Sequence, residues 1–316
     1  MKVKLSILLV TFNHGQYIDQ ALNSLFKQKF EGDIELVVAD DGSSDRTMDI
    51  IRSYEGTDDR FYFKYLDSGS NLGVTGNYRR GFAACSGEYV AVLEGDDYWV
   101  SPMKLQRQRD FLNVHWECDL CSVNYFVYEE EGSRFTPRTA IGSGYRLVGA
   151  RDLIADNLVG NFSTCMYRKS ALDVLPEKLF EIKSYDWIVN ICVARRSLIG
   201  FLEAPMSVYR LHAAGIWTKN SPVEKLRTQL DLIPDYDALT QYVFHEDFDL
   251  LASRLRQSIV ASQIGNVADF VAGPAGDFLP VLLDWMPTAL VSAARAIVPP
   301  ALKRFIVRKL RRNRAV

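Results

Sequence analysis

The first hundred residues alternate between two kinds of segment, and this alternation constrains the fold more than any other feature of the sequence. Short runs rich in Val, Ile and Leu, typical of strands buried on both faces, alternate with stretches whose apolar residues recur at helical spacing. The expected strands cover residues 3–10, 34–40, 60–67 and 88–94, and the expected helices cover 16–28, 44–54 and 77–87. Repeated strand and helix units predict an α/β fold with a doubly wound, mostly parallel sheet of the Rossmann-like type.

A polar loop follows each of these four strands. In such a sheet, ligands bind beyond the carboxyl ends of the strands, so the four loops predict one site at a shared edge. The last loop contains three acids, Glu94, Asp96 and Asp97. Like charges this close repel, and either open solvent around an acidic turn or a bound cation offsets the repulsion. The position beside three other polar loops favours a cation with oxygen ligands, Mg or Mn.

The pattern changes after residue 100. The expected elements are a helix at 102–113, a strand at 118–128, a polar loop at 129–144, helices at 151–157 and 185–197, and short strands at 200–204 and 206–212. From about residue 221 onward the amphipathic stretches predict an all-helical extension with a basic tail.

Composition excludes several classes of protein. A formal net charge of −2 argues against nucleic acid as the main partner, and five scattered cysteines fit a reducing compartment better than a disulfide framework. The apolar run at the start is too short for a signal peptide, and no stretch has the roughly 20 apolar residues of a membrane-spanning helix. We therefore expect a cytoplasmic protein.

The tail at residues 302–314 is basic and lacks acids, with apolar residues interleaved. Its charged residues are Lys303, Arg304, Arg308, Lys309, Arg311, Arg312 and Arg314. A solvated helical face, an interfacial helix on anionic lipid and a nucleic-acid contact all fit such a run. The loss of acidic residues over the last thirty positions favours the lipid surface, as a peripheral contact on the inner face of the membrane.

Two common nucleotide signatures are missing from the sequence. The loop at 40–45 does not match the glycine fingerprint of dinucleotide-binding folds, and no phosphate loop ending in Gly-Lys-Ser/Thr is present. These absences argue against a hydride-transfer enzyme and a P-loop NTPase. Carboxylates and a divalent cation can still bind a diphosphate.

Taken in order, the motifs resemble those of the family 2 glycosyltransferases, which have the GT-A fold. The resemblance spans about residues 3–217 and rests on "LLVTFN", "VVADDGSSDRT", "NLGVTGN", "SGEYVAVLEGDDYW", "YDW" and "SVYRLH". The segment "EGDDYW" is similar to the family's Asp-x-Asp motif, with Glu94 in place of the first Asp. The resemblance implies an enzyme that transfers a sugar from a nucleotide diphosphate donor, most commonly a UDP-sugar, to an acceptor hydroxyl with inversion.

The resemblance also implies roles for individual residues. The nucleotide-sugar-binding set is Thr11, Asn13, Asp40, Asp41, Asn71, Asn77, Glu94 and Asp96. Asp96 and His212 would hold the divalent cation, Mn or Mg, that bridges the donor diphosphate. For Asn71 and Asn77, a plain turn or cap residue is an equal alternative. Residues 1–100 would form the nucleotide-sugar-binding half, 101–220 the acceptor-binding half, and 221–316 the helical extension.

Asp186 stands where a helix is expected to begin. As an N-cap it would satisfy the helix end, and by the resemblance it would be the general base that deprotonates the acceptor, held ionised by the helix dipole. Trp187 beside it is expected to anchor the core rather than stack on a sugar. Arg210 pairs with a phosphate or an acid, while His14 and His245 are expected at the surface.

Other interpretations remain open on sequence alone. His115, Cys118 and Cys121 have zinc-like spacing, but no second pair follows, which favours buried thiols. A sugar nucleotidylyltransferase and a catalytically silent, membrane-docking scaffold are the competing functions. The favoured prediction is a glycosyltransferase of bacterial envelope polysaccharide or glycolipid synthesis, acting on a glycan or lipid-linked acceptor.

Overall fold

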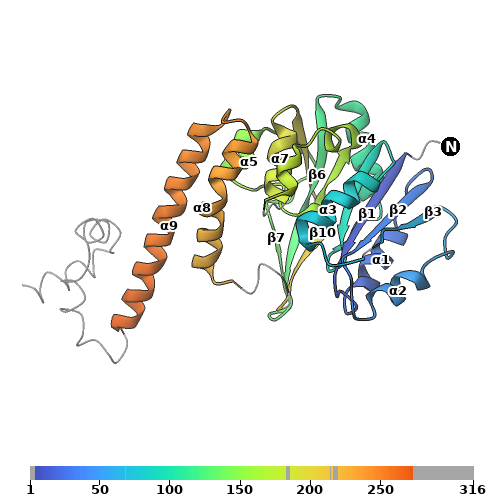
Figure 1. Ribbon diagram of the computed structural model, residues 1–316, viewed down its shortest axis with the longest axis horizontal. Helices are drawn as coiled ribbons and strands as arrows, with labels where there is room; N and C mark the ends of the chain where they lie inside the picture. Colours follow the sequence, from blue (N-terminus) through green and yellow to red (C-terminus); the bar gives the residue numbers. More distant parts are fainter. Residues whose placement is uncertain (1–3, 68, 183–185, 214, 216–219, 273–316) are drawn as a thin grey trace, which may run out of the picture. The chain divides into compact units, whose positions relative to one another are not determined.

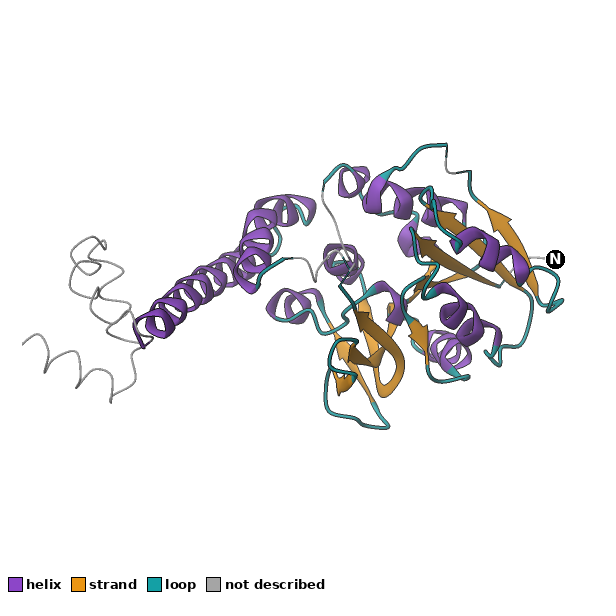
Figure 2. Ribbon diagram, turned by 90° about the horizontal axis from the view of Figure 1, so that it is seen from below, coloured by secondary structure: helices purple, strands orange, loops and turns teal. Residues whose placement is uncertain are grey.

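Ten strands form one mixed sheet in the computed structural model, which describes residues 4–67, 69–182, 186–213, 215 and 220–272 (Figure 1). The strand order along the sheet is β3-β2-β1-β4-β9-β6-β10-β5, with β7 paired to β6 and β8 paired to β10. Figure 2 shows helices flanking the strands. The predicted α/β architecture, doubly wound and mostly parallel, is confirmed, and the later strands add antiparallel pairs to it.

The first half of the sheet follows the predicted alternation. Its elements are β1 (Leu5–Thr11), α1 (Ile18–Phe26), β2 (Ile34–Asp40), α2 (Thr47–Ser53), β3 (Phe61–Tyr65), α3 (Gly73–Ala84) and β4 (Tyr89–Glu94). Strands β1 to β4 pair in parallel. Helix α3 begins four residues before the predicted start, because the loop ahead of it is bound by a carboxylate described below.

Strand β1 lies at the centre of this half and is buried on both faces. Leu5, Ile7 and Leu9 belong to the core cluster that also contains the apolar face of α1. Leu8 points to the opposite face, where a Cβ on Gly81 of α3 would lie only 2.5 Å from one of its methyl carbons. The glycine therefore lets α3 pack directly on the strand, which explains why helices cover both faces of the sheet.

The second half of the sheet is irregular. Its strands are β5 (Tyr98–Trp99), β6 (Cys118–Glu129), β7 (Arg134–Pro137), β8 (Tyr145–Val148), β9 (Met166–Arg168) and β10 (Leu198–Leu211). Strand β9 runs antiparallel to both β4 and β6, so it joins the two halves, while β6 and β10 are parallel to one another.

Three predictions for this half are wrong. The segment 129–144 is not wholly a loop, because β7 folds back on β6 as an exposed hairpin strand. The stretches 200–204 and 206–212 form one strand, β10, with register shifts on both sides of Pro205. Strands β8 and β9 have no counterpart in the prediction, since their short segments gain stability from cross-strand partners rather than from local pattern.

Short helices complete this half. They are α4 (Lys104–Val114), α5 (Ala150–Ala155), η1 (Phe162–Thr164), α6 (Lys169–Leu172), η2 (Glu177–Phe180) and α7 (Asp186–Ala194). Residues 187–194 of α7 are all buried. Trp187 anchors this helix in the core, as predicted, with its indole N–H donating to the carbonyl oxygen of Leu153 at 2.7 Å.

The chain divides into two compact units. The first comprises residues 1–219 and 234–248, and the second comprises 220–233 and 249–316. Helices α8 (Pro222–Leu239) and α9 (His245–Ala272) each contribute to both units. In the described ranges, no helix is both long and apolar enough to cross a membrane. The basic tail at 302–314 lies outside the described residues.

Candidate functional site

The strand register brings the predicted polar residues to one edge of the sheet. Thr11 at the end of β1 lies opposite Asp40 at the end of β2, and Val10 lies opposite Glu94 at the end of β4. Because β9 is antiparallel to both β4 and β6, strands β6 and β10 end at the same edge. His212, the residue after β10, therefore arrives beside the acids that follow β4.

Gly95 makes the turn after β4 fit against the turn after β1. A Cβ at this position would lie 2.8 Å from Thr11 Oγ1 and 2.8 Å from His14 Nδ1. Both of these polar atoms are buried, and neither has a hydrogen-bond partner among the residues that the structure describes. The glycine thus allows the acidic turn to approach two polar groups that a larger residue would displace.

Asp96 lies between two imidazole rings. Its Oδ2 is 3.1 Å from His212 Nε2 and 3.7 Å from His14 Nε2. Burial works to raise the pKa of Asp96, but the hydrogen bond from His212 and the charges of the two histidines outweigh it and lower the pKa. Asp96 is therefore the ionised acid of the cluster, and the prediction that His14 is a surface residue is wrong.

Asp97 connects the turn after β4 to the second half of the sheet through two hydrogen bonds. Its Oδ1 accepts the backbone N–H of Arg210 at 2.9 Å, and its Oδ2 accepts a hydrogen bond from Asn161 Nδ2 at 3.1 Å. Burial and then the charge of Asp96 raise its pKa well above the usual range. Asp97 is a structural acid.

Glu94, which replaces the first acid of the expected motif, is half-buried. Its Oε1 accepts a hydrogen bond from the hydroxyl of Tyr78 at 2.8 Å. Burial, followed by the charge of Asp96, raises the pKa of Glu94 to about 8. The three crowded acids are thus not equivalent, because Glu94 and Asp97 favour the neutral form and Asp96 favours the charged one.

Arg210 locks β10 to the acidic turn. Its Nε donates to the backbone oxygen of Asp96 at 2.9 Å, and its Nη1 lies 3.8 Å from a carboxylate oxygen of Glu130. Its guanidinium lies 4.8, 5.3 and 5.5 Å from the ring centroids of Tyr17, Tyr98 and Tyr128. Of the two predicted partners of Arg210, a phosphate or an acid, the structure shows the acid.

The loop after β2 is held together by Asp40 and Asn13. Asp40 accepts hydrogen bonds from the backbone N–H groups of Gly42 and Ser43 at 3.2 and 2.9 Å. Asn13, at a positive φ of 55°, accepts the N–H of Ser44 at 2.8 Å through its side-chain oxygen. These two side chains tie the loops after β1 and β2 into one polar surface.

Asp41 shapes the loop that precedes α3. Its two carboxylate oxygens accept the backbone N–H groups of Leu72 and Gly73 at 2.8 and 2.9 Å. Asn71 donates from its side-chain nitrogen to the backbone oxygen of Asp41 at 2.9 Å. This exchange of hydrogen bonds draws the predicted residues Asp41 and Asn71 together, and it explains why α3 begins at Gly73.

Asn77 lies deeper than its predicted neighbours. It is buried, and its side-chain nitrogen donates to the backbone oxygen of Ala39 at 2.8 Å. Its side-chain oxygen accepts a hydrogen bond from Arg80 Nε at 2.8 Å, and Arg80 Nη2 donates to the backbone oxygen of Asp40 at 2.5 Å. Arg80 was not predicted, although it follows Asn77 by one turn of the same expected helix.

Asp186 begins α7 and accepts the backbone N–H of Trp187 at 2.6 Å. Burial raises the pKa of Asp186 to about 7, against the hydrogen bonds of Trp187 and Asn157, which lower it. The expected effect of the helix dipole is therefore outweighed by desolvation. A carboxyl group that titrates near neutral pH is suited to accept a proton.

Tyr209 on β10 has a raised pKa. The residue is half-buried, and burial followed by the charges of Asp97, Glu94, Asp186 and Asp96 raises its pKa. The sequence prediction quoted Tyr209 within a motif but gave it no role.

A protein-family model matches the first part of the chain. The model described as glycosyl transferase family 2 matches residues 6–175, which is more than half of the chain and includes both acidic loops. The chain belongs to glycosyl transferase family 2. This assignment confirms the resemblance drawn from the sequence motifs.

Curated relatives of this family 2 protein come from several bacteria. It is 33% identical to an uncharacterized protein of Mycobacterium tuberculosis over 213 residues, which are 67% of this chain and 60% of the relative. It is 31% identical to an uncharacterized glycosyltransferase of Nostoc over 223 residues, or 67% of this chain and 66% of the relative. The chain thus spans somewhat less than two thirds of the length of these relatives.

A third relative matches a shorter segment. The GalNAc(5)-diNAcBac-PP-undecaprenol beta-1,3-glucosyltransferase of Campylobacter jejuni is 36% identical over 98 residues, which are 31% of each chain.

Solved structures confirm the GT-A fold of the family 2 chain. The complex of S. aureus TarS with UDP-GlcNAc superimposes with a TM-score of 0.58 at 19% identity, covering 82% of this chain and 81% of that one. The mannosyltransferase PcManGT of Pyrobaculum calidifontis, solved with GDP-Man and Mn²⁺, gives a TM-score of 0.55 at 13% identity, covering 94% and 87%.

The acidic edge offers part of a cation site. In the described ranges, no group of three or more His, Cys, Asp and Glu side chains is arranged closely enough to hold a metal ion by itself. Asp96 and His212 nevertheless provide an ionised carboxylate oxygen and an imidazole nitrogen 3.1 Å apart. This donor pair fits a divalent cation whose other positions are filled by ligand oxygens.

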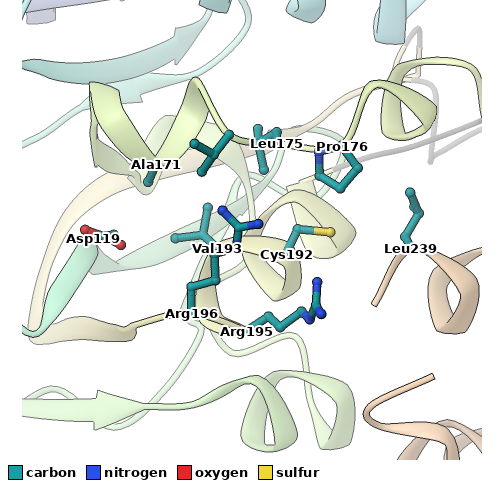
Figure 3. Close-up of a pocket in the computed structure, with 10 residues that line it drawn as sticks. Asp119, Ala171, Leu175, Pro176, Cys192, Val193, Arg195, Arg196 and Leu239 are labelled. Atoms are coloured by element: carbon teal, nitrogen blue, oxygen red, sulfur yellow. The ribbon is translucent and has the colours of Figure 1, made fainter. Parts of the chain in front are cut away.

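A separate hollow lies at the other end of the strands. Figure 3 shows it between α6 and α7, with Asp119 from the beginning of β6 and with Cys192, Arg195 and Arg196 from α7 and the turn after it. None of the predicted site residues lines this hollow.

All five cysteines of the chain, Cys192 included, are described, and each is a buried free thiol.

Proposed function

We propose that this family 2 protein is a metal-dependent, inverting glycosyltransferase that moves a sugar from a nucleotide diphosphate donor, first of all a UDP-sugar, to an acceptor hydroxyl. One observation carries the proposal. Asp96, whose pKa is lowered, lies 3.1 Å from His212 at the edge where β1, β2, β4 and β10 end, and Asp186 at the start of α7 has a pKa raised to about 7. A sugar transfer of this kind needs both a charge that binds a cation and a base that accepts a proton.

The donor would bind over the loops that follow β1, β2 and β3. Asp40 and Asp41 act chiefly by ordering these loops, since their carboxylates are engaged with backbone N–H groups. Thr11 and Asn13 would contact the nucleoside from β1, with Asn71 closing the pocket. Asn77 supports this surface from below through the carbonyl of Ala39.

Asp96 and His212 would hold the cation at the diphosphate end of the donor. When bound, a divalent cation neutralises the charge that grows on the departing diphosphate. Asp97 and Arg210 keep the turn and β10 in fixed relation, so the two ligands meet without a large rearrangement. Glu94, hydrogen-bonded to Tyr78, fixes the start of the turn.

Asp186 would be the general base. Its carboxylate takes the proton of the acceptor hydroxyl as the oxygen attacks the anomeric carbon, and the bond between that carbon and the diphosphate oxygen breaks on the opposite face. The product sugar then has the inverted configuration, and no covalent enzyme intermediate forms. A pKa of about 7 keeps a large fraction of Asp186 ionised near neutral pH while leaving it basic enough to take the proton.

We also propose an acceptor on a membrane-bound lipid carrier in envelope polysaccharide or glycolipid synthesis. The named Campylobacter relative, a glucosyltransferase of an undecaprenol-linked glycan, supports this class of acceptor. The basic residues at 302–314 would contact anionic lipid on the inner face of the membrane.

A donor panel tests the proposed reaction. The purified protein is incubated with Mn²⁺, a short alcohol acceptor and UDP-GlcNAc, UDP-glucose or GDP-mannose, and released nucleotide is measured. We expect release from at least one donor, and NMR coupling at the anomeric proton of the product should show inversion. Retention of configuration would exclude Asp186 as a simple base, and nucleotide release at the wild-type rate by Asp186→Asn would exclude it altogether.

A further inference from the structure

We infer that His14 is a third protein ligand of the proposed cation, beside Asp96 and His212. The inference rests on the proposed function, because it concerns the same metal. It departs from the predicted pair of ligands, and from the expectation that His14 lies at the surface. The observations that carry it are the fixed position of the His14 loop, the unsatisfied state of its ring and its distance from Asp96.

The backbone around His14 is tied down on both sides. Asn13 donates its N–H to Ser43 Oγ at 2.8 Å, and Gly15 donates its N–H to Asp45 Oδ2 at 2.8 Å. The carbonyl oxygen of His14 itself accepts the N–H groups of residues 17 and 18 at 2.8 Å each, at the start of α1. The ring is therefore presented to the acidic turn by a rigid loop, as a preorganised ligand requires.

The ring of His14 is directed at Asp96 without forming a hydrogen bond to it. The side chain is only 20% exposed, and Nε2 lies 3.7 Å from Asp96 Oδ2, beyond hydrogen-bond distance. Nδ1 is buried against Gly95 and has no partner within the described part of the chain. Polar groups with little exposure normally have a hydrogen-bond partner, so an imidazole this close to a carboxylate with neither nitrogen hydrogen-bonded is unusual.

The distances fit ligands around one cation. Donor atoms about 2.1 Å from an octahedral cation, on neighbouring corners, are about 3.0 Å apart. His212 Nε2 already has this spacing from Asp96 Oδ2, at 3.1 Å, and His14 Nε2, at 3.7 Å, exceeds it by about 0.7 Å. A small rotation of the His14 ring would close the set, which otherwise falls short of a complete metal site.

Two imidazoles with one carboxylate also define the preferred metal. Mg²⁺ strongly favours oxygen ligands, whereas the divalent ions of the first transition row, Mn²⁺ included, accept imidazole nitrogen more readily. A site with His14, His212 and Asp96 therefore selects Mn²⁺ over Mg²⁺ more strongly than a site with one histidine. Diphosphate oxygens of the donor would occupy the open positions.

The test measures Mn²⁺ binding rather than activity. Electron paramagnetic resonance and calorimetry follow Mn²⁺ binding to the wild type and to His14→Ala, each with UDP present. We expect the substitution to weaken Mn²⁺ binding at least tenfold, as loss of even an outer-shell partner does at other metal sites, and to remove one nitrogen coupling from the pulsed spectrum. The preference for Mn²⁺ over Mg²⁺ should fall at the same time.

His245→Ala is the matched control. His245 also faces an aspartate, with Nδ1 2.6 Å from Asp237 Oδ2, but it lies on α9 rather than at the acidic edge. This variant should bind Mn²⁺ as the wild type does. A second variant, His14→Cys, should give a thiolate-to-cobalt absorption band when loaded with Co²⁺, which the buried native thiols of the wild type should not give.

The outcomes separate the inference from the proposed function. Two results would overturn the role of His14 alone. One is that His14→Ala binds Mn²⁺ with the affinity and the nitrogen coupling of the wild type, and the other is that a folded His14→Cys gives no cobalt band. In either case Asp96 and His212 would remain the proposed ligands. No Mn²⁺ binding by the wild type, with or without UDP, would overturn both. Thermal unfolding of the metal-free variants shows whether either substitution has disturbed the fold.

Discussion

The two halves of the sheet build their parts of the site in different ways. In the first half, regular parallel strands end at the same level, and the acids Asp40 and Asp41 are bound to backbone N–H groups. In the second half, the strands are mixed in direction, and Asp186 stands at a helix start where burial raises its pKa to about 7. Strand register thus fixes the binding surface of the first half, whereas the raised pKa of Asp186 depends on how helix α7 is packed.

Asp186→Asn separates the two halves most sharply. The amide keeps the size of the side chain but cannot take a proton, so we expect the rate of transfer to fall about 10²- to 10⁴-fold. Binding of UDP with Mn²⁺ should stay within twofold of the wild type, because Asp186 is not among the residues proposed to hold the nucleotide or the cation. A parallel loss of UDP affinity would show that the halves do not act separately.

The pH dependence of transfer tests whether the raised pKa of Asp186 governs the reaction. Since the base must be ionised and the pKa of Asp186 is raised to about 7, kcat/KM should fall tenfold per pH unit below about 7 and level off above it on this account. Initial rates between pH 5 and 8 provide the measurement. A profile that stays flat down to pH 5 would indicate a base with an ordinary carboxyl pKa and would rule out the assigned role of this buried acid.

Gly95→Ala would add a methyl group at a close contact in the first half. The added Cβ would lie 2.8 Å from both Thr11 Oγ1 and His14 Nδ1, so the acidic turn must shift. We expect about 1–3 kcal/mol of lost stability and weaker Mn²⁺-dependent binding of UDP. Gly69→Ala is the control, since a Cβ there meets no atom within 4 Å. Equal behaviour of the two variants in calorimetry and thermal unfolding would contradict the packing argument.

Lys104, at the start of α4, tests the packing of the second half. The residue is fully buried, with Nζ 4.3 Å from the centre of the Trp99 ring and 2.9 Å from Gln108 Oε1. Burial lowers its pKa from 10.5 to about 7, so the unfolded chain binds more protons between these values and stability rises with pH in that window.

From pH 7 to pH 9 this effect amounts to about 2 kcal/mol, at 1.36 kcal/mol for each fully developed pH unit. Lys104→Met removes the titrating group, and its free energy of unfolding in denaturant titrations should rise less over this range than that of the wild type. The same pH slope in both proteins would show that Lys104 is not the source.

The sequence was informative where structure depends on local pattern. The four strands of the first half and the helices between them were predicted from periodicity alone, and strand ends then located Thr11, Asp40 and Glu94 at one edge. Strands β7, β8 and β9 were missed, because segments of three or four residues carry too little pattern and gain stability only from their partners.

Sequence pattern could not predict which acids of the site are ionised or which partners they bind. Asp96 and Asp97 are adjacent in the chain, yet one is ionised beside two histidines and the other is buried against Arg210 and Asn161. Their difference depends on residues more than sixty positions away. The rule that places the polar loops at one edge applies equally to His14, because this residue directly follows the first loop.

Calorimetric titration of UDP tests whether Asp96 holds a cation on which UDP binding depends. The wild type and Asp96→Ala are titrated with Mn²⁺ present and again with chelator, so that each measurement differs only in the metal or in the carboxylate that would hold it. We expect the wild type to bind UDP with Mn²⁺ and to lose at least tenfold in UDP affinity with chelator. We expect Asp96→Ala to bind UDP weakly in both cases. UDP affinity that is the same in all four titrations would contradict a cation held by Asp96.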